Sequence, residues 1–413
     1  MLAAGAAPRF VVVTDVVREA PEGVEVELLG PAFEAFERAA PGLLDSAVLR
    51  DFHDELSAMQ DVAAEPGAAN EYDSLGHSPF VAAVRGAHVE GEGGLVWDDA
   101  GRVYHERGHF FKDEGAPLPA PADGRASRRP EHAFPALATT IQRFGHMYYH
   151  FVAETLPKLV LLLQSGSVPE GTPLLSWGMP FERQFYEALG VDYDARVVPY
   201  DAGHVYSADT LYMPTPSPRI TPSREGLQAV REALGVRELP EEERGLIVYC
   251  TREDEASRAV ANEKELLQAL RKAHPDKEVV VYKTGRPLDE VIELFQRADV
   301  ILGPHGAGLS HLLFAAPGTH VVEFLFMRDP PMMFWHMSRA LGMDYWMLPV
   351  PQSFWMQPEM EVPVQEVLDL LHLALQGDGD GDGDGGRACP EGEAAAAGGR
   401  CAPCPPGEYA SAQ

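Results

Sequence analysis

The sequence predicts an α/β protein of two units, the second of which is a doubly wound parallel sheet. Between residues 245 and 341, runs rich in β-branched residues alternate with amphipathic segments of about ten residues, the pattern of strands joined by crossover helices. A glycine-rich turn at 303–308 directly follows one of these runs. A proline-dense stretch at 213–225 separates this regular half from an earlier half in which the alternation is weaker.

The second half contains the clearest elements. Asn262, with Glu265 three residues later, has the spacing of a capping box and predicts the start of a helix. In this half strands are predicted at 245–249, 278–282, 299–302 and 319–325, and further helices at 288–298, 307–315 and 331–341. In the first half strands are predicted at 173–175 and 197–198, and helices at 149–164 and 181–189.

Composition divides the chain into four parts. Repeated aspartate and glycine at 377–386 cannot bury apolar surface, so the ordered chain is expected to end near Gln376. The segment 114–131, rich in proline, alanine and arginine, is expected to be an exposed loop. The predicted parts are a first unit, a connector with a helix at 226–234, a second unit and a disordered tail, at residues 1–215, 216–243, 244–376 and 377–413.

Charge argues against two classes of partner. The 413 residues include 33 Lys and Arg against 63 Asp and Glu, which gives a formal net charge of −30. Nucleic acid and an anionic membrane are not expected as main partners, because both need a positive surface. No run approaches the ~20 apolar residues of a membrane span, and the N-terminus lacks the order of a signal peptide. We therefore expect a soluble chain, or a soluble fragment of a longer anchored protein.

The four cysteines do not predict a metal centre. Cys250 ends a predicted strand and is expected to be a buried thiol. Cys389, Cys401 and Cys404 lie in the tail without a nearby histidine, which makes a poor zinc set. Disulfides or free thiols are the favoured states of these three.

The turn that begins the stretch GPHGAGLSHLLFAAPGTHVVEFLF, at 303–326, predicts an anion site. Gly303, Gly306 and Gly308 allow turns and close approaches that other residues do not. The amides that open the following helix carry positive partial charge and suit a phosphate or diphosphate. His305 lies in the middle of the turn and is poorly placed to fill a core. The alternative is a turn whose glycines serve only packing.

A second candidate is the pair His150 and Glu154. The two residues are four apart, so on a helix they share one face. A carboxylate beside an imidazole can tune its basicity for a general base near neutral pH. Alternatively, the pair only stabilises the helix.

Arg252 and Arg258 follow the first strand of the second unit. Arginines in a first βα loop face the same crevice as the glycine turn, where a guanidinium can bind a diphosphate in bidentate fashion. The alternative is a solvated loop in which they pair with the acidic residues at 253–255.

Two further acidic features are weaker signals. Glu323 stands in an apolar strand and is interpreted either as a ribose ligand or as a buried partner of an arginine. Asp192 and Asp194 form a D-x-D, a spacing that holds a divalent metal in many sugar transferases, but short acidic matches are common in an acidic chain. We interpret this D-x-D as a turn and predict no metal ligands.

Taken in order, these segments resemble glycosyltransferase family 61. The resemblance is carried by the aromatic-rich stretch at 148–158, by a block of Arg252, Arg258, Asn262 and Glu263, and by the stretch at 303–323. The family usually has asparagine where this chain has His311, and its eukaryotic members usually carry an anchor or signal.

The resemblance implies a GT-B architecture, in which two Rossmann-like domains face each other across a cleft, and inversion at the anomeric carbon. It implies transfer of GlcNAc or a pentose from a UDP-sugar to a hydroxyl of a glycan or protein acceptor, in the Golgi or ER lumen. No cofactor is required, and a divalent metal is not expected. We predict His150, Glu154 and His305 as catalytic residues, with either His150 or Glu154 as the base that removes the acceptor's proton. The predicted donor-binding residues are Arg252, Arg258, Gly303, His305, Gly306, Ala307, Gly308, Leu309 and Glu323.

Two other functions are alternatives. A non-catalytic member of the same fold would bind a nucleotide sugar or glycan without transfer, and His311 in place of asparagine is the one hint of it. A dehydrogenase is disfavoured, because no G-x-G-x-x-G follows the first strand of the second unit.

Overall fold

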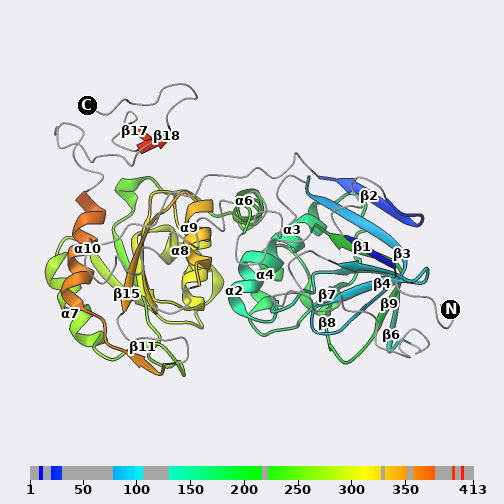
Figure 1. The fold of residues 1–413 in the computed structure, drawn as a ribbon, viewed down its shortest axis with the longest axis horizontal. Coiled ribbons are helices and arrows are strands. Elements are labelled where there is room, and N and C mark those ends of the chain that lie inside the picture. Colours follow the sequence, from blue (N-terminus) through cyan, green and yellow to red (C-terminus); the bar gives the residue numbers. More distant parts are fainter. Residues whose placement is uncertain are drawn as a thin grey trace.

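A computed structural model describes residues 9–12, 20–29, 78–105, 130–215, 222–326, 331–350, 357–376, 393–395 and 401–403. In these residues the chain is a mixed α/β protein with two main sheets (Figure 1). Helices α2 (Tyr148–His150), α3 (Leu156–Gln164) and α6 (Arg224–Ala233) lie between them. Most of the predicted loop at 114–131, the acidic tract at 377–386, Cys389 and Cys404 lie outside the described residues. No helix in the described ranges is long and apolar enough to cross a membrane.

The second half forms a five-stranded sheet in which every neighbouring pair is parallel, as predicted. The strands are β10 (Leu246–Cys250), β12 (Glu278–Tyr282), β13 (Ala298–Pro304), β14 (His320–Phe326) and β15 (Asp344–Val350). Their order is β12-β10-β13-β14-β15, so the direction of winding reverses between β10 and β13. In doubly wound sheets ligands bind beside the carboxyl ends of the strands at this reversal.

Helices cover both faces of this sheet, because alternate strand residues point to opposite sides. One face packs on α8, η6 and α9, and the other on α7 and α10. The bounds are α7 (Glu263–Ala273), α8 (Leu288–Gln296), η6 (Ala307–Phe314), α9 (Met333–Ala340) and α10 (Val364–Gln376). The predicted helices are thus confirmed in position.

Two local details differ from the predictions. The segment after the glycine turn is a 3-10 helix, η6, and not an α-helix. Asn262 does precede α7, but its side chain makes no cap. It instead exchanges two hydrogen bonds with the backbone of Val362, 2.8 and 3.0 Å long, because that segment runs beside it.

The first half forms a nine-stranded sheet that differs from the Rossmann-like sheet predicted there. The pairs β6–β7, β7–β8, β6–β9 and β1–β5 are parallel, whereas β2, β4 and β9 each pair antiparallel with β3. The antiparallel pairs arise where the connection is short, as at 91–94 between β3 and β4, because a short turn can join only antiparallel strands. The strands are β1 (Arg9–Val12), β2 (Val24–Leu28), β3 (Phe80–Glu90), β4 (Leu95–Asp98), β5 (Arg102–His105), β6 (His132–Thr139), β7 (Leu174–Ser176), β8 (Val197–Pro199) and β9 (Tyr206–Pro214).

The remaining described elements are short. They are η4 (Phe151–Thr155), α4 (Glu182–Ala188), α5 (Tyr193–Arg196), η5 (Glu241–Glu243), and the strand pairs β11 (Ala259–Val260) with β16 (Glu359–Met360) and β17 (Glu393–Ala395) with β18 (Cys401–Pro403). The last pair lies in the predicted tail. The predicted domain boundaries stay predictions.

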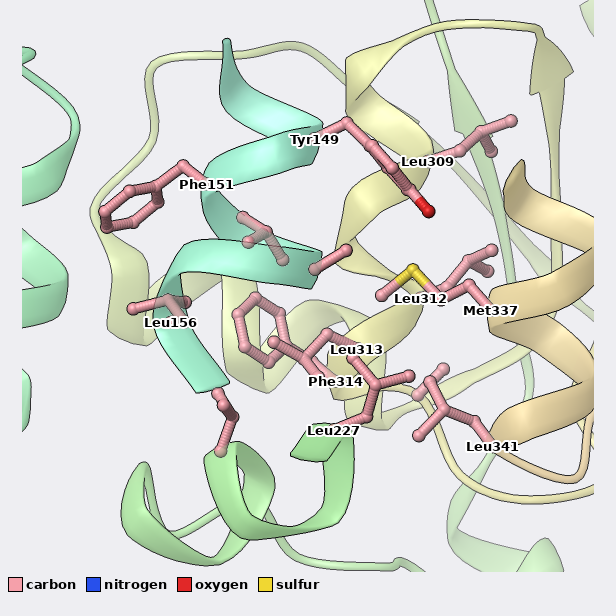
Figure 2. Close-up of a cluster of buried hydrophobic side chains, with 14 of the residues drawn as sticks. Tyr149, Phe151, Leu156, Leu227, Leu309, Leu312, Leu313, Phe314, Met337 and Leu341 are labelled. Carbon is pink, nitrogen blue, oxygen red and sulfur yellow. The ribbon is translucent and has the colours of Figure 1, made fainter. Parts of the chain in front are cut away.

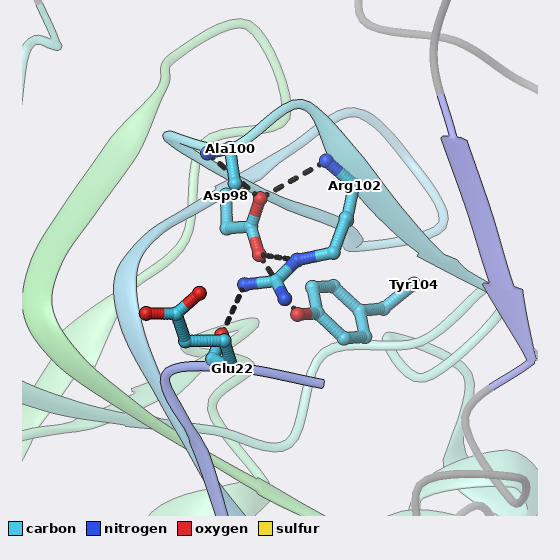
Figure 3. Close-up of polar contacts among 5 residues, drawn as sticks. All are labelled: Glu22, Asp98, Ala100, Arg102 and Tyr104. Atoms are coloured by element: carbon cyan, nitrogen blue, oxygen red, sulfur yellow. Dashed lines mark hydrogen bonds and ion pairs between the residues drawn. The ribbon is translucent and has the colours of Figure 1, made fainter. Parts of the chain in front are cut away.

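The turn from β4 to β5 is held by one buried carboxylate (Figure 3). Asp98 is fully buried and accepts hydrogen bonds from the amides of Ala100 and Arg102, each 3.0 Å long. Its other oxygen accepts from Arg102 Nε at 2.6 Å and from the Tyr104 hydroxyl at 2.8 Å. Arg102 also donates to the Glu22 carbonyl at 2.7 Å. This carboxylate is saturated, so we give it a structural role.

One continuous apolar core reaches both sheets. On the side of the first sheet it includes α2, η4, α3 and α6, and on the side of the second it includes α8, η6 and α9. Figure 2 shows Leu156 and Leu227 from the first side, close to Leu312, Leu313 and Phe314 of η6. The position of η6, and with it the end of the glycine turn, therefore depends on helices of the first half.

Leu312→Ala tests this shared core. Because Leu312 is fully buried, the substitution should lower the free energy of unfolding by about 3 kcal/mol. Urea denaturation followed by circular dichroism measures the change. Leu373→Ala, at a side chain 40% exposed on α10, is the control and should stay within about 0.5 kcal/mol of the parent. Equal effects of the two substitutions would contradict the packing described.

Candidate active site

The glycine turn lies at the winding reversal, at the carboxyl end of β13 beside that of β10. Gly303 has no room for a side chain, since a Cβ there would lie 2.7 Å from the Cys250 carbonyl oxygen. A Cβ on Gly306 would collide with the guanidinium of Arg252. Close approach of the Cys250 backbone therefore requires a glycine at position 303, and the Arg252 side chain lies directly against the turn at Gly306. Cys250 itself is buried as predicted, and burial raises the pKa of its thiol.

His305 is held by a buried carboxylate. Its Nδ1 hydrogen-bonds Glu323 on β14, and the other oxygen of Glu323 accepts from the hydroxyl of Tyr345 on β15. His305 is 2% exposed and Glu323 is fully buried. A carboxylate accepts only, so Nδ1 carries the hydrogen and Nε2 is the acceptor nitrogen of the neutral ring. Since both its oxygens are engaged inside the protein, Glu323 orients His305 in this structure.

Burial lowers the pKa of His305, and Glu323 opposes that shift. Arg258 and Arg252 lower the same pKa further, which places both guanidiniums within electrostatic reach of the imidazole. His305 is therefore neutral at neutral pH. An anion bound between these groups would favour the imidazolium, because an opposite charge raises the pKa of a histidine.

Arg252 and Arg258 lie together beside the turn. The Nε of Arg252 donates to the Ser257 carbonyl at 3.0 Å, which keeps the loop closed, and its head lies 3.9 Å from Glu255. Arg258 is 8% exposed. Burial, and after it the positive charge of Arg252, lower the pKa of Arg258 to about 10. A buried guanidinium whose pKa is lowered by a neighbouring guanidinium favours an anionic ligand.

The backbone of Arg258 is itself unusual. Its φ is +64°, a left-handed conformation that a long side chain rarely adopts. The amide donates to the Gln357 carbonyl at 2.7 Å, and the next residues pair with β16. The surrounding backbone thus imposes this conformation, and such residues concentrate at functional sites.

Among the backbone amides at the start of η6, two are available to an anion in this structure. The Leu309 amide donates to the Gly306 carbonyl at 3.0 Å, and the His305 amide donates to Phe324. Ala307 and Gly308 precede the first hydrogen bond of η6, so their amides have no partner within that helix. They are the amides that can bind an anion.

His150 and Glu154 form the predicted pair. His150 Nδ1 and Glu154 Oε1 are 2.8 Å apart, and Glu154 Oε2 accepts from Gln142 Nε2 at 2.6 Å. Glu154 is fully buried, whereas the His150 side chain is 10% exposed. Nδ1 therefore carries the hydrogen, and Nε2 is left as the basic nitrogen. This is the arrangement of a histidine base oriented by a carboxylate.

The pair lies on a π-helical turn. Helices α2 and α3 are joined by η4, where the Leu156 amide bonds the carbonyl of Phe151, five residues back. π-turns inside α-helices occur mostly at functional sites.

Two aromatic rings connect the histidines. Tyr149 lies 5.4 Å from the His150 ring and 5.3 Å from Phe334, and Phe334 lies 5.1 Å from His305, measured between ring centroids. Burial raises the pKa of the Tyr149 hydroxyl most, and the charges of Glu154 and Glu323 raise it further. The two histidine–carboxylate pairs, from different sheets, therefore border the same aromatic pair.

His311 also joins the two halves. Its Nδ1 donates to the Gly308 carbonyl at 3.0 Å, so its Nε2 accepts the Tyr148 hydroxyl at 2.7 Å. The ring is buried against Tyr282 and Phe295, and burial lowers its pKa to about 4. The histidine in place of the usual asparagine thus links α2 to η6.

The D-x-D does not join this site. Asp192 caps α5 by accepting from the Ala195 amide at 3.1 Å, and Asp194 pairs with Arg183 at 2.6 and 2.9 Å. Sequence reasoning missed Gln142, Tyr345, Tyr149 and Phe334. Of these Tyr149 had a signal, because it lies in the aromatic-rich stretch at 148–158. Tyr345 had none, because it depends on the parallel pairing of β14 and β15, which puts it on the same sheet face as Glu323.

The pH dependence of stability should report His311. Its pKa rises from about 4 in the folded chain to its ordinary 6.5 on unfolding, so the unfolded state takes up the proton first as pH falls. Stability should therefore decrease between about pH 6.5 and 4, and this group should contribute about 2 kcal/mol between pH 7 and 5.

Urea denaturation at both pH values of the parent and of His311→Asn measures that contribution. The difference between the two pH values should be about 2 kcal/mol smaller in the variant. His372→Asn, an exposed histidine on α10, should keep the parental difference. An undiminished difference in His311→Asn would show that His311 is not buried and neutral.

One family model matches part of the chain. The family model described as Glycosyltransferase 61 matches residues 148–322, which span the chain from α2 to β14 and include both histidine–carboxylate pairs apart from the final Glu323. No curated protein matches the chain. Residues 148–322 thus match glycosyltransferase family 61, and this match supports a glycosyltransferase activity.

Proposed function

We propose that the chain transfers a sugar from a UDP-sugar to a hydroxyl group of a glycan or protein acceptor, with inversion at the anomeric carbon. The observation that carries the proposal is that two histidine–carboxylate pairs border the same two aromatic rings, with the buried Arg258 and the half-buried Arg252 beside them. Inversion requires a base on the acceptor side and charge stabilisation on the donor side. The two pairs supply these from different sheets, as a GT-B arrangement requires.

His150 is the proposed general base. Its Nε2 is the acceptor nitrogen of a ring fixed by Glu154, and its side chain reaches the surface. It takes the proton of the acceptor hydroxyl as that oxygen forms the new bond to the anomeric carbon. Glu154 and Gln142 hold the tautomer and stabilise the imidazolium that forms.

The donor side holds the diphosphate. Arg252 and Arg258 pair with the phosphate oxygens, and the amides of Ala307 and Gly308 complete the cradle. As the glycosidic bond breaks, negative charge grows on the leaving UDP, and these groups stabilise it. His305 lies on the turn, and the arriving anion raises its pKa, so that it can add a further positive charge.

Two arginines and helix amides can neutralise a diphosphate without a metal, and we propose transfer without a divalent cation. GlcNAc and a pentose are the proposed donor sugars. By the family resemblance we propose the Golgi or ER lumen as the location.

His150→Ala should lower kcat by about 10²- to 10⁴-fold, because the acceptor hydroxyl then loses its base. Glu154→Gln should cause a smaller loss, because the ring is only misoriented. Both variants should bind UDP as the parent does, which calorimetry tests and which also shows that they fold. His204→Ala, on a side chain 42% exposed at the other end of the first sheet, is the control. Full transfer by His150→Ala would refute the assignment.

UDP should raise the melting temperature of the parent chain in EDTA. Arg258→Ala and Arg252→Ala should each weaken UDP binding about 10- to 100-fold, the effect of losing a charge-assisted hydrogen bond. Arg183→Ala, an exposed arginine paired with Asp194, should bind UDP normally. A melting shift that needs manganese would refute metal independence, and no shift with or without manganese would refute the donor proposal.

A further inference from the structure

We propose that Phe144 is a specificity-determining residue on which a sugar ring of the acceptor packs, which makes the acceptor a glycan. The inference rests on the proposed function, since it takes His150 as the base. It is carried by the turn at 142–147, which joins β6 to the helix with His150.

Phe144 touches the proposed base. Its ring centroid lies 5.4 Å from that of His150, and the residue is half-buried. An acceptor hydroxyl bonded to the imidazole therefore belongs to a group that also reaches the Phe144 ring. Sugar rings carry an apolar face that packs on an aromatic side chain, while their edges carry hydroxyls.

The backbone of Phe144 is in a conformation that favours glycine. Its φ is +65°, which is a genuine outlier for a bulky residue. Glycine would adopt this conformation at no steric cost, and asparagine at little. Strained backbone of this kind persists where the surrounding structure imposes it, and it clusters at ligand sites.

The turn is indeed imposed by its neighbours. The Gln142 carbonyl accepts from the Gly145 amide at 3.1 Å and from Trp177 Nε1 at 3.2 Å, and the Met147 amide donates to the Phe144 carbonyl at 2.8 Å. Gly145 has no space for a Cβ, which would lie 2.9 Å from Trp177 Nε1. The same Gln142 holds Glu154, so the turn and the base are fixed together.

Two further residues of this turn, Arg143 and His146, carry polar groups suited to sugar hydroxyls. The guanidinium of Arg143 lies 4.9 Å from the Phe144 ring centroid, and Arg143 is exposed. Exposed His146 lies edge-on to half-buried Trp177, with centroids 5.1 Å apart. Aromatic faces with a few charged and imidazole donors bind a sugar better than an extended peptide, whose backbone needs a strand edge.

Three substitutions of Phe144 distinguish a ring that packs on the sugar from a ring that only supports the fold. Phe144→Gly removes the ring and relieves the backbone, Phe144→Ala removes the ring and keeps the strain, and Phe144→Tyr keeps the ring. Leu373→Ala, remote and exposed, is the control. The probes are methyl β-glycosides of xylose, glucose, galactose and N-acetylglucosamine, and a peptide rich in serine and threonine. Binding to the UDP-loaded full chain is measured by NMR titration, with the UDP affinity and melting temperature of each variant.

At least one glycoside should bind the parent, and its Kd should rise about tenfold in both Phe144→Gly and Phe144→Ala, with Phe144→Tyr and the control near the parent. Melting temperatures should differ, with the Gly variant above the Ala variant, while UDP affinity stays constant. The inference would be overturned if no glycoside bound the parent or if only the peptide bound. It would also be overturned if the glycoside Kd of the variants changed in step with their melting temperature. Failure of the parent to bind UDP would instead overturn the proposed function.

Discussion

The packing of the helix at 148–164 against η6 is the interaction on which the site depends. The helix belongs to the first half and carries His150, whereas η6 belongs to the second half and continues from the turn that carries His305. Their shared apolar core, with the Tyr148–His311 hydrogen bond beside it, fixes one histidine relative to the other. Each sheet presents its own residues, but only this contact places the two histidine–carboxylate pairs around the same aromatic rings.

The site combines two buried carboxylates with two arginines whose guanidiniums are partly removed from water. Glu154 and Glu323 are fully buried, and each accepts a hydrogen bond from the imidazole of its histidine. Arg252 and Arg258 lie close to each other, and burial lowers the pKa of both. The free protein thus holds two guanidiniums beside the turn, although the chain as a whole is strongly acidic. A local positive site in an acidic protein attracts a compact anion while the rest of the surface repels polyanions.

The second half could be predicted closely because its signals are local. β-branched runs and glycine turns define β10, β12, β13 and β14, and the predicted turn lies at the winding reversal. In the first half the predicted strands at 173–175 and 197–198 and the predicted helices at 149–164 and 181–189 are present. The antiparallel part of its sheet could not be predicted, because it depends on pairing between distant segments that no periodicity reveals. Within the site, spacing predicted the pairing of His150 with Glu154. It did not predict that Glu323 holds His305, which depends on the register of neighbouring strands, or that Phe144 is left-handed, which depends on Trp177.

The π-helical turn at η4 has a consequence for how the protein can vary. One additional residue in a helical turn rotates everything beyond it by about 100° relative to a regular α-helix. The direction of His150 on α2 relative to the apolar face of α3 therefore differs from what a regular α-helix would give. Deleting a single residue there would turn His150 by about 100° relative to the apolar face of α3. The π-turn therefore sets the direction of the histidine relative to the packed face of α3.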